Sequence, residues 1–545
     1  MQFHLRYKPS PVVLLLFILA AAAGWKALLL AMNAFPFNAD EAVVGLMARH
    51  ILQGERPIFF YGQAYMGSLD AFLVAGGFML FGQYVWVIRL VQTILYLGLI
   101  ISTIALGKEI FGSWKIGLAA GGLMVIPTVN MTLYTTASLG GYGEAMLIGN
   151  LILLLTLRIA RKDPDTIWLP SGFLWAGWGL LFGLGLWANG LTLIYSAPAG
   201  ILLALRLIQN GRGLSVRKMS GWIGLAVLGF LVGAAPWWVY AFSQGWQSLF
   251  AELLGGAVAV EKEPWVVRTF NHFISFFLLG GTVSLGFRPP WAVRWLGIPL
   301  LPFVLMGWAG VFVVCARGLR RAAGKTRTGA LLLLAVCAAL AAGFIFTSFG
   351  VDPSGRYFLP LSIPLVMAAA YTIFRIETRT LWKVLIFCIL IVYHGWGTLQ
   401  SALDNPPGLT TQFNAITQID TRYQDELIQF LRAEGETRGY TNYWVAYPTA
   451  FLSAEELIYT PRLPYHANLD YTPRDDRYHP YDDILAGSAK TAYITTHNPA
   501  LDEKLVQGLR QNGISWDEQQ IGDYRVYYHL SRVIRPAELG FGENP

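Results

Sequence analysis

Two adjacent carboxylates, Asp40 and Glu41, follow closely on the first apolar segment of the chain. They open a stretch with a helical apolar pattern, which Gly54 and Pro57 interrupt. One interpretation is a charge pair at a helix N-terminus, where the helix dipole favours acids. The other is a carboxylate at a membrane surface that acts as general base toward a hydroxyl group. The local pattern does not decide between these interpretations or between the two carboxylates.

Glu144 is a second candidate acid. It follows Gly140, Gly141 and Gly143, which allow close approach of the backbone, and it begins an otherwise apolar run. A carboxylate at membrane depth is costly unless it is paired or faces a watery cavity. The structural alternative is an ion pair with Lys26, which lies in the outer half of the first apolar segment.

A third polar cluster, Asp352, Arg356 and Tyr357, lies in the run FGVDPSGRYFLPL before a late apolar segment. Arg356 fits an interfacial anchor. It equally fits a group that holds a lipid phosphate through its planar guanidinium. No Walker loop, HExxH motif, dinucleotide fingerprint or serine nucleophile elbow accompanies these clusters.

The composition indicates the class of protein in which these polar groups lie. Hydrophobic residues make up 55% of the 545 residues and charged residues 13%, about half the share that is usual in soluble proteins. This composition excludes a soluble globular or disordered chain and predicts a polytopic membrane protein. The three cysteines, Cys315, Cys337 and Cys388, lie in apolar runs and predict no disulfide or zinc site. At His466 and His479, in the aromatic and charge-rich part of the tail, a solvated loop is favoured over metal binding.

Eleven apolar segments have about the length needed to cross a bilayer. The run 71–82 is too short to cross and is interpreted as interfacial or re-entrant, whereas 266–287 is ambiguous. No internal repeat is visible, which weakens an inverted-repeat transporter. The expected spans are 11–32, 86–107, 116–134, 143–158, 168–187, 191–207, 220–241, 295–316, 329–348, 357–374 and 380–400.

The distribution of charge predicts the orientation in the membrane. Residues 1–400 hold 28 basic and 13 acidic side chains, whereas residues 401–545 hold 12 and 20. With the N-terminus in the cytoplasm, most basic residues of the first part lie on the inner side, as the positive-inside rule requires. An odd number of spans then places 401–545 outside the cell membrane. This pattern fits a bilayer better than a nucleic-acid partner.

Two domains are expected. Residues 1–400 form the transmembrane domain, and 33–85 is its first outer loop with juxtamembrane helices. Residues 401–545 form a small extracytoplasmic α/β domain, because helical patterns alternate there with β-like runs. The helical patterns are Asp425–Glu434 and Leu501–Gly513, and the β-like runs are Thr491–Thr495 and Tyr524–Tyr528.

Three runs together resemble the GT-C superfamily of membrane glycosyltransferases, and within it the protein mannosyltransferase and ArnT-like aminoarabinose transferase branch (glycosyltransferase family 39). They are NADEAVVGLMARHILQGERP, FYGQAYMGSLDAF and SGRYFLPL. The runs GLGLWANGLTLIYSAPAG and GAAPWWVYAFSQG support the resemblance, which covers about residues 10–400.

The resemblance implies a polytopic α-helical membrane fold of about 11 transmembrane helices that is GT-C-like, with an outer cavity for a polyprenyl-phosphate sugar donor. It implies Asp40, with Glu41 adjacent, as the catalytic base and Glu144 as a second acid. Candidates for binding the donor phosphate are Arg356, Tyr357, Lys262 and Arg268. Candidates for the acceptor or sugar side are Tyr61, Gln63, Tyr65 and Asp70.

The function that the resemblance implies is inverting transfer of a hexosyl or pentosyl group to a hydroxyl of a lipid, glycan or protein acceptor. No cofactor is certain, and a divalent metal on Asp40 or Glu144 stays open. Membrane lipids and no nucleic acid are expected as further partners. The loop Tyr465–Asp483 is expected to shape the acceptor site, the alternative being that it only covers that site. A transporter or flippase of a lipid-linked saccharide and a non-catalytic scaffold in envelope assembly remain alternatives.

Overall fold

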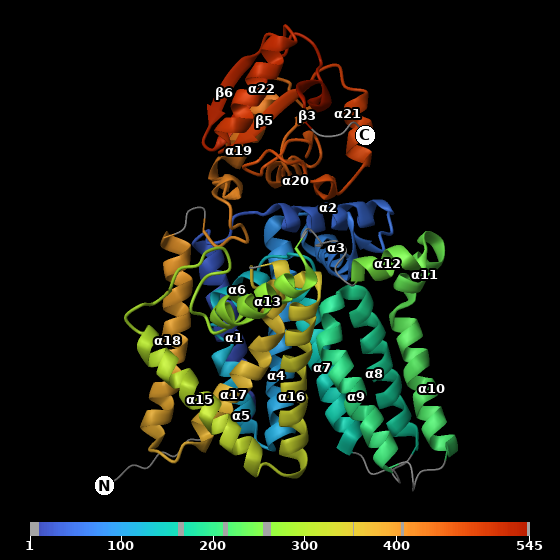
Figure 1. Cartoon of the computed structure of the whole chain (residues 1–545), viewed down its shortest axis with the longest axis vertical. Coiled ribbons are helices and arrows are strands. Elements are labelled where there is room, and N and C mark those ends of the chain that lie inside the picture. Colours follow the sequence, from blue (N-terminus) through green and yellow to red (C-terminus); the bar gives the residue numbers. More distant parts are fainter. Residues whose placement is uncertain are drawn as a thin grey trace.

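The computed structural model describes residues 10–161, 168–210, 216–253, 263–352, 354–404 and 408–541. A bundle of long helices carries a smaller α/β domain at one end (Figure 1). The long helices are α1 (Pro11–Ala31), α4 (Val85–Phe111), α7 (Tyr142–Arg161), α8 (Trp168–Ala188), α9 (Leu193–Asn210), α10 (Val216–Gly233), α15 (Leu301–Arg321), α16 (Gly324–Phe346), α17 (Ser362–Arg375) and α18 (Thr380–Asp404).

Nine helices of the described part are long and apolar enough to cross a membrane, or up to ten if one bent pair counts as a span. The multi-pass helical architecture is confirmed, and the expected number of eleven is approximate. The expected span 116–134 is two shorter helices, α5 (Trp114–Leu123) and α6 (Val129–Tyr134), with Pro127 between them. The expected span 220–241 bends by 65° between α10 and α11 (Ala235–Gln244). In both places a proline lacks the N–H that a continuous helix needs.

The two segments of uncertain status are both helical. The run 71–82 belongs to α3 (Leu69–Phe81), which is too short to span a bilayer. The segment 266–287 contains α13 (Trp265–Ser275), a π-helical turn η3 (Phe276–Gly281) and α14 (Thr282–Ser284). Together these three form an apolar helical stretch that is long enough to cross.

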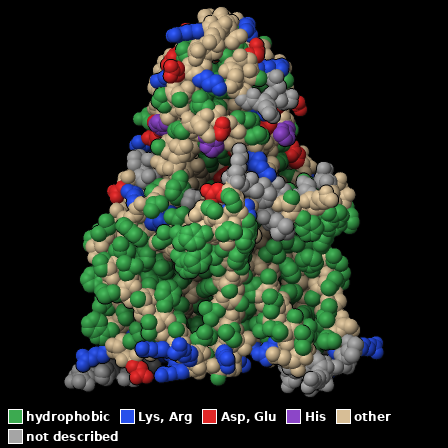
Figure 2. All heavy atoms as spheres, viewed as in Figure 1, with side chains coloured by type: hydrophobic (Ala, Val, Ile, Leu, Met, Phe, Trp, Pro, Cys, Tyr) green, Lys and Arg blue, Asp and Glu red, His purple; other side chains and the backbone are tan. Residues whose placement is uncertain are grey.

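Side-chain types on the surface agree with a membrane location. Hydrophobic side chains cover the sides of the helical bundle in a broad belt, and Lys and Arg gather at the end away from the α/β domain (Figure 2). Four of these basic residues lie where α15 meets α16: Arg320, Arg321, Lys325 and Arg327.

The segment between α1 and α4 folds onto the end of the bundle below the α/β domain (Figure 1). It contains α2 (Ala39–Gln53), a small hairpin of β1 (Phe59–Phe60) and β2 (Gln63–Gly67), and α3. Asn38 caps α2, since its side chain accepts a hydrogen bond from the backbone N–H of Asp40 at 2.7 Å. Gly54, with φ of 114°, ends the helix in the left-handed conformation that favours glycine.

The α/β domain is built on a five-stranded sheet of order β4-β3-β5-β7-β6. Strand β3 pairs in parallel with β4 and β5, whereas β7 pairs antiparallel with β5 and β6. The expected helical and β-like runs of the tail correspond to α19, α22, β5 and β7. The elements are α19 (Gln424–Ala433), β3 (Arg438–Tyr440), α20 (Tyr443–Leu452), β4 (Ile458–Thr460), α21 (Pro480–Ala486), β5 (Ala492–Thr496), α22 (Pro499–Gln511), β6 (Asp517–Ile521) and β7 (Tyr524–Tyr528).

Helix α20 joins the α/β domain to the first loop by packing along α2. A Cβ added at Gly45 would lie 2.6 Å from the Phe451 ring, so the two helices approach as closely as glycine permits. Near the other end of α2, Arg49 lies over the Phe451 ring at 4.8 Å and donates to the Phe451 carbonyl at 3.1 Å. The starts of both helices therefore meet at Asp40 and Tyr443.

Candidate functional site

Asp40 lies in the first turn of α2 and is partly exposed. Its Oδ1 accepts a hydrogen bond of 2.5 Å from the hydroxyl of Tyr443, the first residue of α20. The other oxygen, Oδ2, accepts no hydrogen bond from any described residue. A carboxylate held through one oxygen can use the other as a base.

Glu41 is fully buried and faces away from this contact. Its two carboxylate oxygens accept from Arg89 Nε at 3.0 Å and Arg89 Nη2 at 2.9 Å. This bidentate pair occupies the carboxylate of Glu41 from both sides. The arrangement therefore favours Asp40 over Glu41 as the group that meets a substrate.

Arg477 reaches toward Asp40 from the α/β domain. Its guanidinium lies over the Tyr443 ring at 5.3 Å and over the Phe60 ring at 5.9 Å. With the Gln63 amide oxygen facing it, Gln63 accepts from both Nη atoms at 2.6 and 2.7 Å, and its nitrogen donates to the Tyr65 hydroxyl at 3.3 Å. Gln63 and Tyr65 therefore lie at this site, together with a cation that the sequence did not single out.

Arg356 enters the site from the bundle. It pairs with Asp352, and its guanidinium lies 5.0 Å from the centre of the Tyr357 ring. The turn before it depends on Gly355, which has φ of 88° and would bring an added Cβ within 3.0 Å of Asn130. The Tyr65 ring packs on Phe349 at 6.2 Å, and Phe349 packs on Tyr357 at 5.0 Å, so the first loop and this turn face a common space.

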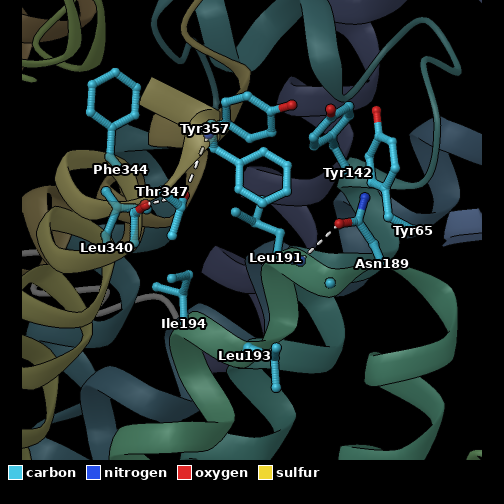
Figure 3. Close-up of a pocket in the computed structure, with 13 residues that line it drawn as sticks. Tyr65, Tyr142, Asn189, Leu191, Leu193, Ile194, Leu340, Phe344, Thr347 and Tyr357 are labelled. Carbon is cyan, nitrogen blue, oxygen red and sulfur yellow. Dashed lines mark hydrogen bonds between the residues drawn. The ribbon is translucent and has the colours of Figure 1, made fainter. Parts of the chain in front are cut away.

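A cavity of about 210 Å³ opens beside these groups. Tyr65, Tyr142 and Tyr357 lie at one end of it, and Leu193, Ile194 and Leu340 lie toward the other (Figure 3). Burial raises the pKa of Tyr65, whereas Arg356 and Arg477 lower it. The cavity thus has hydroxyl groups at the end that meets the polar cluster and an apolar interior.

Glu144 lies beside a different residue from the one considered in the sequence. Lys26 donates to the backbone carbonyl of Thr135 at 2.5 Å and to the Thr136 hydroxyl at 2.7 Å, so the proposed Lys26–Glu144 ion pair is wrong. Glu144 instead lies beside Asp70, whose carboxylate accepts from Gln92 at 2.7 Å and from Ser138. Both acids are buried.

The remaining predicted site residues are placed elsewhere. Tyr61 donates to Glu55 at 2.7 Å and stacks on Tyr478 of the α/β domain at 4.9 Å, so it belongs to the contact between the two parts of the chain. Arg268 lies on α13 and is partly exposed. Lys262 lies outside the described residues.

Neither Asp40 nor Glu144 belongs to a group of three candidate metal ligands among the described residues. Among the described residues, one group of three candidate ligands comes together, Asp476, His479 and Asp482. It lies in the α/β domain, where Arg462 pairs with Asp476 at 3.0 Å and with Asp482 at 2.5 Å.

No family model matches the sequence, and no curated protein matches it. Among solved structures, ArnT from Cupriavidus metallidurans bound to undecaprenyl phosphate is similar, with a TM-score of 0.60 and 12% identity over 94% of this chain and 97% of that chain. The same protein in its apo state gives 0.56 and 13% identity, over 93% and 98%. The apo oligosaccharyltransferase of Archaeoglobus fulgidus gives 0.52 and 12%, over 93% and 73%. The chain has the GT-C fold.

The GT-C resemblance inferred from three short runs is thus confirmed at the level of the fold. The likeness also extends beyond the part that the sequence matched, because it includes the α/β domain after residue 400. Two site residues that the sequence did not single out, Tyr443 and Arg477, come from that domain. The loop Tyr465–Asp483, which contains Arg477, was the one sequence signal that pointed to it.

The Glu41–Arg89 pair generates a first prediction. Glu41→Gln leaves Arg89 buried without a full countercharge, which for buried pairs costs about 3–5 kcal/mol. We expect a lower melting temperature and a lower yield of folded protein in detergent. Asp40→Asn is the matched comparison, since Asp40 is partly exposed, and its melting temperature should stay near that of the wild type. Equal melting temperatures for Glu41→Gln and the wild type would contradict a structural role for Glu41.

Asp475, two residues before Arg477, generates a second prediction. Burial raises its pKa to about 7, against the lowering effect of Arg477. A raised pKa in the folded state means that stability is full below the unfolded pKa, near about 4, and is lost as pH rises toward 7. Melting curves should therefore show the wild type losing several degrees between pH 5 and 8, and Asp475→Asn losing less. The exposed Asp483→Asn is the control, and it should follow the wild type.

Proposed function

We propose that this chain is a glycosyltransferase that takes a sugar from a polyprenyl-phosphate carrier and transfers it to an acceptor hydroxyl. The observation that carries the proposal is a polar cluster at the hydroxyl-lined end of an apolar cavity: Asp40 lies on one side of Tyr65, through Tyr443 and Arg477, and Arg356 lies against Tyr357 on the other. The prenyl chain needs an apolar cavity, the phosphate needs a cation such as Arg356, and the acceptor hydroxyl needs a base such as Asp40. The likeness to ArnT, solved with undecaprenyl phosphate bound, supports the same kind of donor here.

The donor has two parts that require different surroundings. The cavity interior, with Leu193, Ile194 and Leu340, offers apolar contact for the first isoprene units. Arg356 stands next to Tyr357 at the polar end, where its planar guanidinium can bind phosphate oxygens. Its existing partner Asp352 holds it in place through the ion pair.

The reaction is a direct displacement. The acceptor oxygen forms a bond to the anomeric carbon while the bond from that carbon to the phosphate oxygen breaks. The acceptor proton passes to Oδ2 of Asp40, and polyprenyl phosphate leaves with its charge stabilised by Arg356. Attack from the side opposite the phosphate inverts the anomeric centre. The site also increases the reaction rate by holding the acceptor oxygen and the anomeric carbon in line.

The orientation in the cell membrane follows from charge. The positive-inside rule favours the cytoplasmic side for the basic end of the bundle (Figure 2), where α15 meets α16 at Arg320, Arg321 and Lys325. The α/β domain and the site then lie at the outer face. A hexose or pentose donor and a lipid, glycan or protein acceptor are both compatible with a site of this kind.

The transporter alternative needs charged groups within the membrane, such as Lys26 and Glu144, that line a path for cargo. In the structure Lys26 is bound by Thr135 and Thr136, and Glu144 is buried beside Asp70. Lys26 is thus held by hydrogen bonds and Glu144 is enclosed beside a second acid, which gives no support to a path for cargo. The transferase proposal uses the site that the two parts of the chain build together.

The test is release of polyprenyl phosphate from a labelled polyprenyl-phosphate sugar mixture by purified protein, supplied with an acceptor extract. Asp40→Asn should lower release by roughly 10²–10⁴-fold, the usual loss when a general base is removed. Asp404→Asn, an exposed acid at the end of α18, is the control and should leave release unchanged. Release by Asp40→Asn at the wild-type rate would refute the proposed base. No release by the wild type would favour the transporter or scaffold.

A further inference from the structure

The α/β domain touches the candidate base directly. Tyr443 donates to Asp40 Oδ1 at 2.5 Å, and these residues lie 403 positions apart in the chain. Tyr443 is 2% exposed, so water does not compete for its hydroxyl. Hydrogen bonds to a charged acceptor are about twice as strong as those between neutral groups. The contact is therefore strong enough to decide which way the Asp40 carboxylate turns.

The phenol in this contact can act only as a donor. Burial, together with the neighbouring Asp40 carboxylate, raises the pKa of Tyr443 well above its usual range. Its hydroxyl thus keeps its proton at any pH at which the protein works. Arg477 lies over the Tyr443 ring at 5.3 Å, and a cation there favours donation of the hydroxyl proton toward an anion.

The helix that carries Tyr443 is held rigidly. The Phe451 ring packs against the bare backbone at Gly45, and Arg49 binds the Phe451 carbonyl at the far end of α2. Arg49 also pairs with Glu455 at 3.3 Å, and Glu455 accepts from His50 at 2.9 Å. Because α20 is fixed at its far end and along its length, its first residue has little freedom to leave Asp40.

We propose that Tyr443 is a positioning residue of the transferase, which holds the Asp40 carboxylate so that Oδ2 faces the acceptor hydroxyl. The α/β domain is then an integral part of the catalytic site, with Arg477 setting the Tyr443 ring. This inference rests on the proposed function for the role of Asp40. The contact itself stands on the geometry alone.

The test uses two measurements on the full-length protein in detergent. The first is chemical labelling of the Asp40 carboxyl group, which needs no substrate, and the second is release of polyprenyl phosphate. Water-soluble carbodiimide modifies protonated carboxyl groups, and peptide mass spectrometry reads the modification at Asp40 across pH. In Tyr443→Phe the charged carboxylate loses a donor, so Asp40 should be labelled more strongly than in the wild type at the same pH. In the release assay kcat should fall about tenfold, with KM for the donor little changed.

The control is Tyr440→Phe, which removes a hydroxyl from a buried tyrosine whose ring packs on Tyr493 at 5.4 Å in the same domain. It should follow the wild type in both measurements. Unchanged labelling and release in Tyr443→Phe would overturn the proposal, and so would a raised KM for the donor with kcat unchanged. If Tyr443→Phe changes the labelling of Asp40 but release by the wild type does not depend on Asp40, the proposed function is overturned. The catalytic role of the contact is then overturned with it.

Discussion

The ion pair between Glu41 and Arg89 fixes the place where the chain turns from the membrane into α2. Arg89 lies on α4 and also donates to the backbone carbonyl of Phe35 at 3.3 Å, so it holds both the helix and the turn before it. Successive residues of an α-helix point about 100° apart. With Glu41 directed into the bundle, its neighbour Asp40 must point elsewhere, and it points to Tyr443.

That constraint explains how two distant parts of the chain build one site. The first loop contributes Asp40, Gln63 and Tyr65, and the α/β domain closes over them with Tyr443 and Arg477. The bundle adds Arg356 from the turn before α17. Most charged side chains of the site are bound by another side chain. One oxygen of Asp40 is left for a substrate, because Tyr443 takes only the other.

Much of the fold could be read from the sequence, since long apolar runs and their charged ends are local signals. The exceptions have local causes as well: Pro127 lies between α5 and α6, and Pro236 lies just after the bend between α10 and α11. The candidate site was predictable only in part. Asp40, Arg356 and Tyr65 lie in recognisable runs, and the structure brings them together.

The different roles of Asp40 and Glu41 could not be predicted from the sequence, because they depend on partners that lie 403 and 48 residues away in the chain. Glu144 illustrates the same limit, since no local pattern distinguishes Lys26 from Asp70 as its neighbour. Tyr443 and Arg477 carry no motif. Their place in the site comes from the docking of α20 on α2, which depends on the small size of Gly45.

The most direct measurement is a cryo-EM map of the wild-type protein in nanodiscs with saturating polyprenyl phosphate. The account predicts phosphate density against the Arg356 guanidinium, and the first isoprene units in the cavity beside Leu193, Ile194 and Leu340. Asp40 should face the space next to the phosphate, with Tyr443 still on its Oδ1. Lipid bound at a different place in the bundle, with Arg356 and the cavity free of it, would contradict the account.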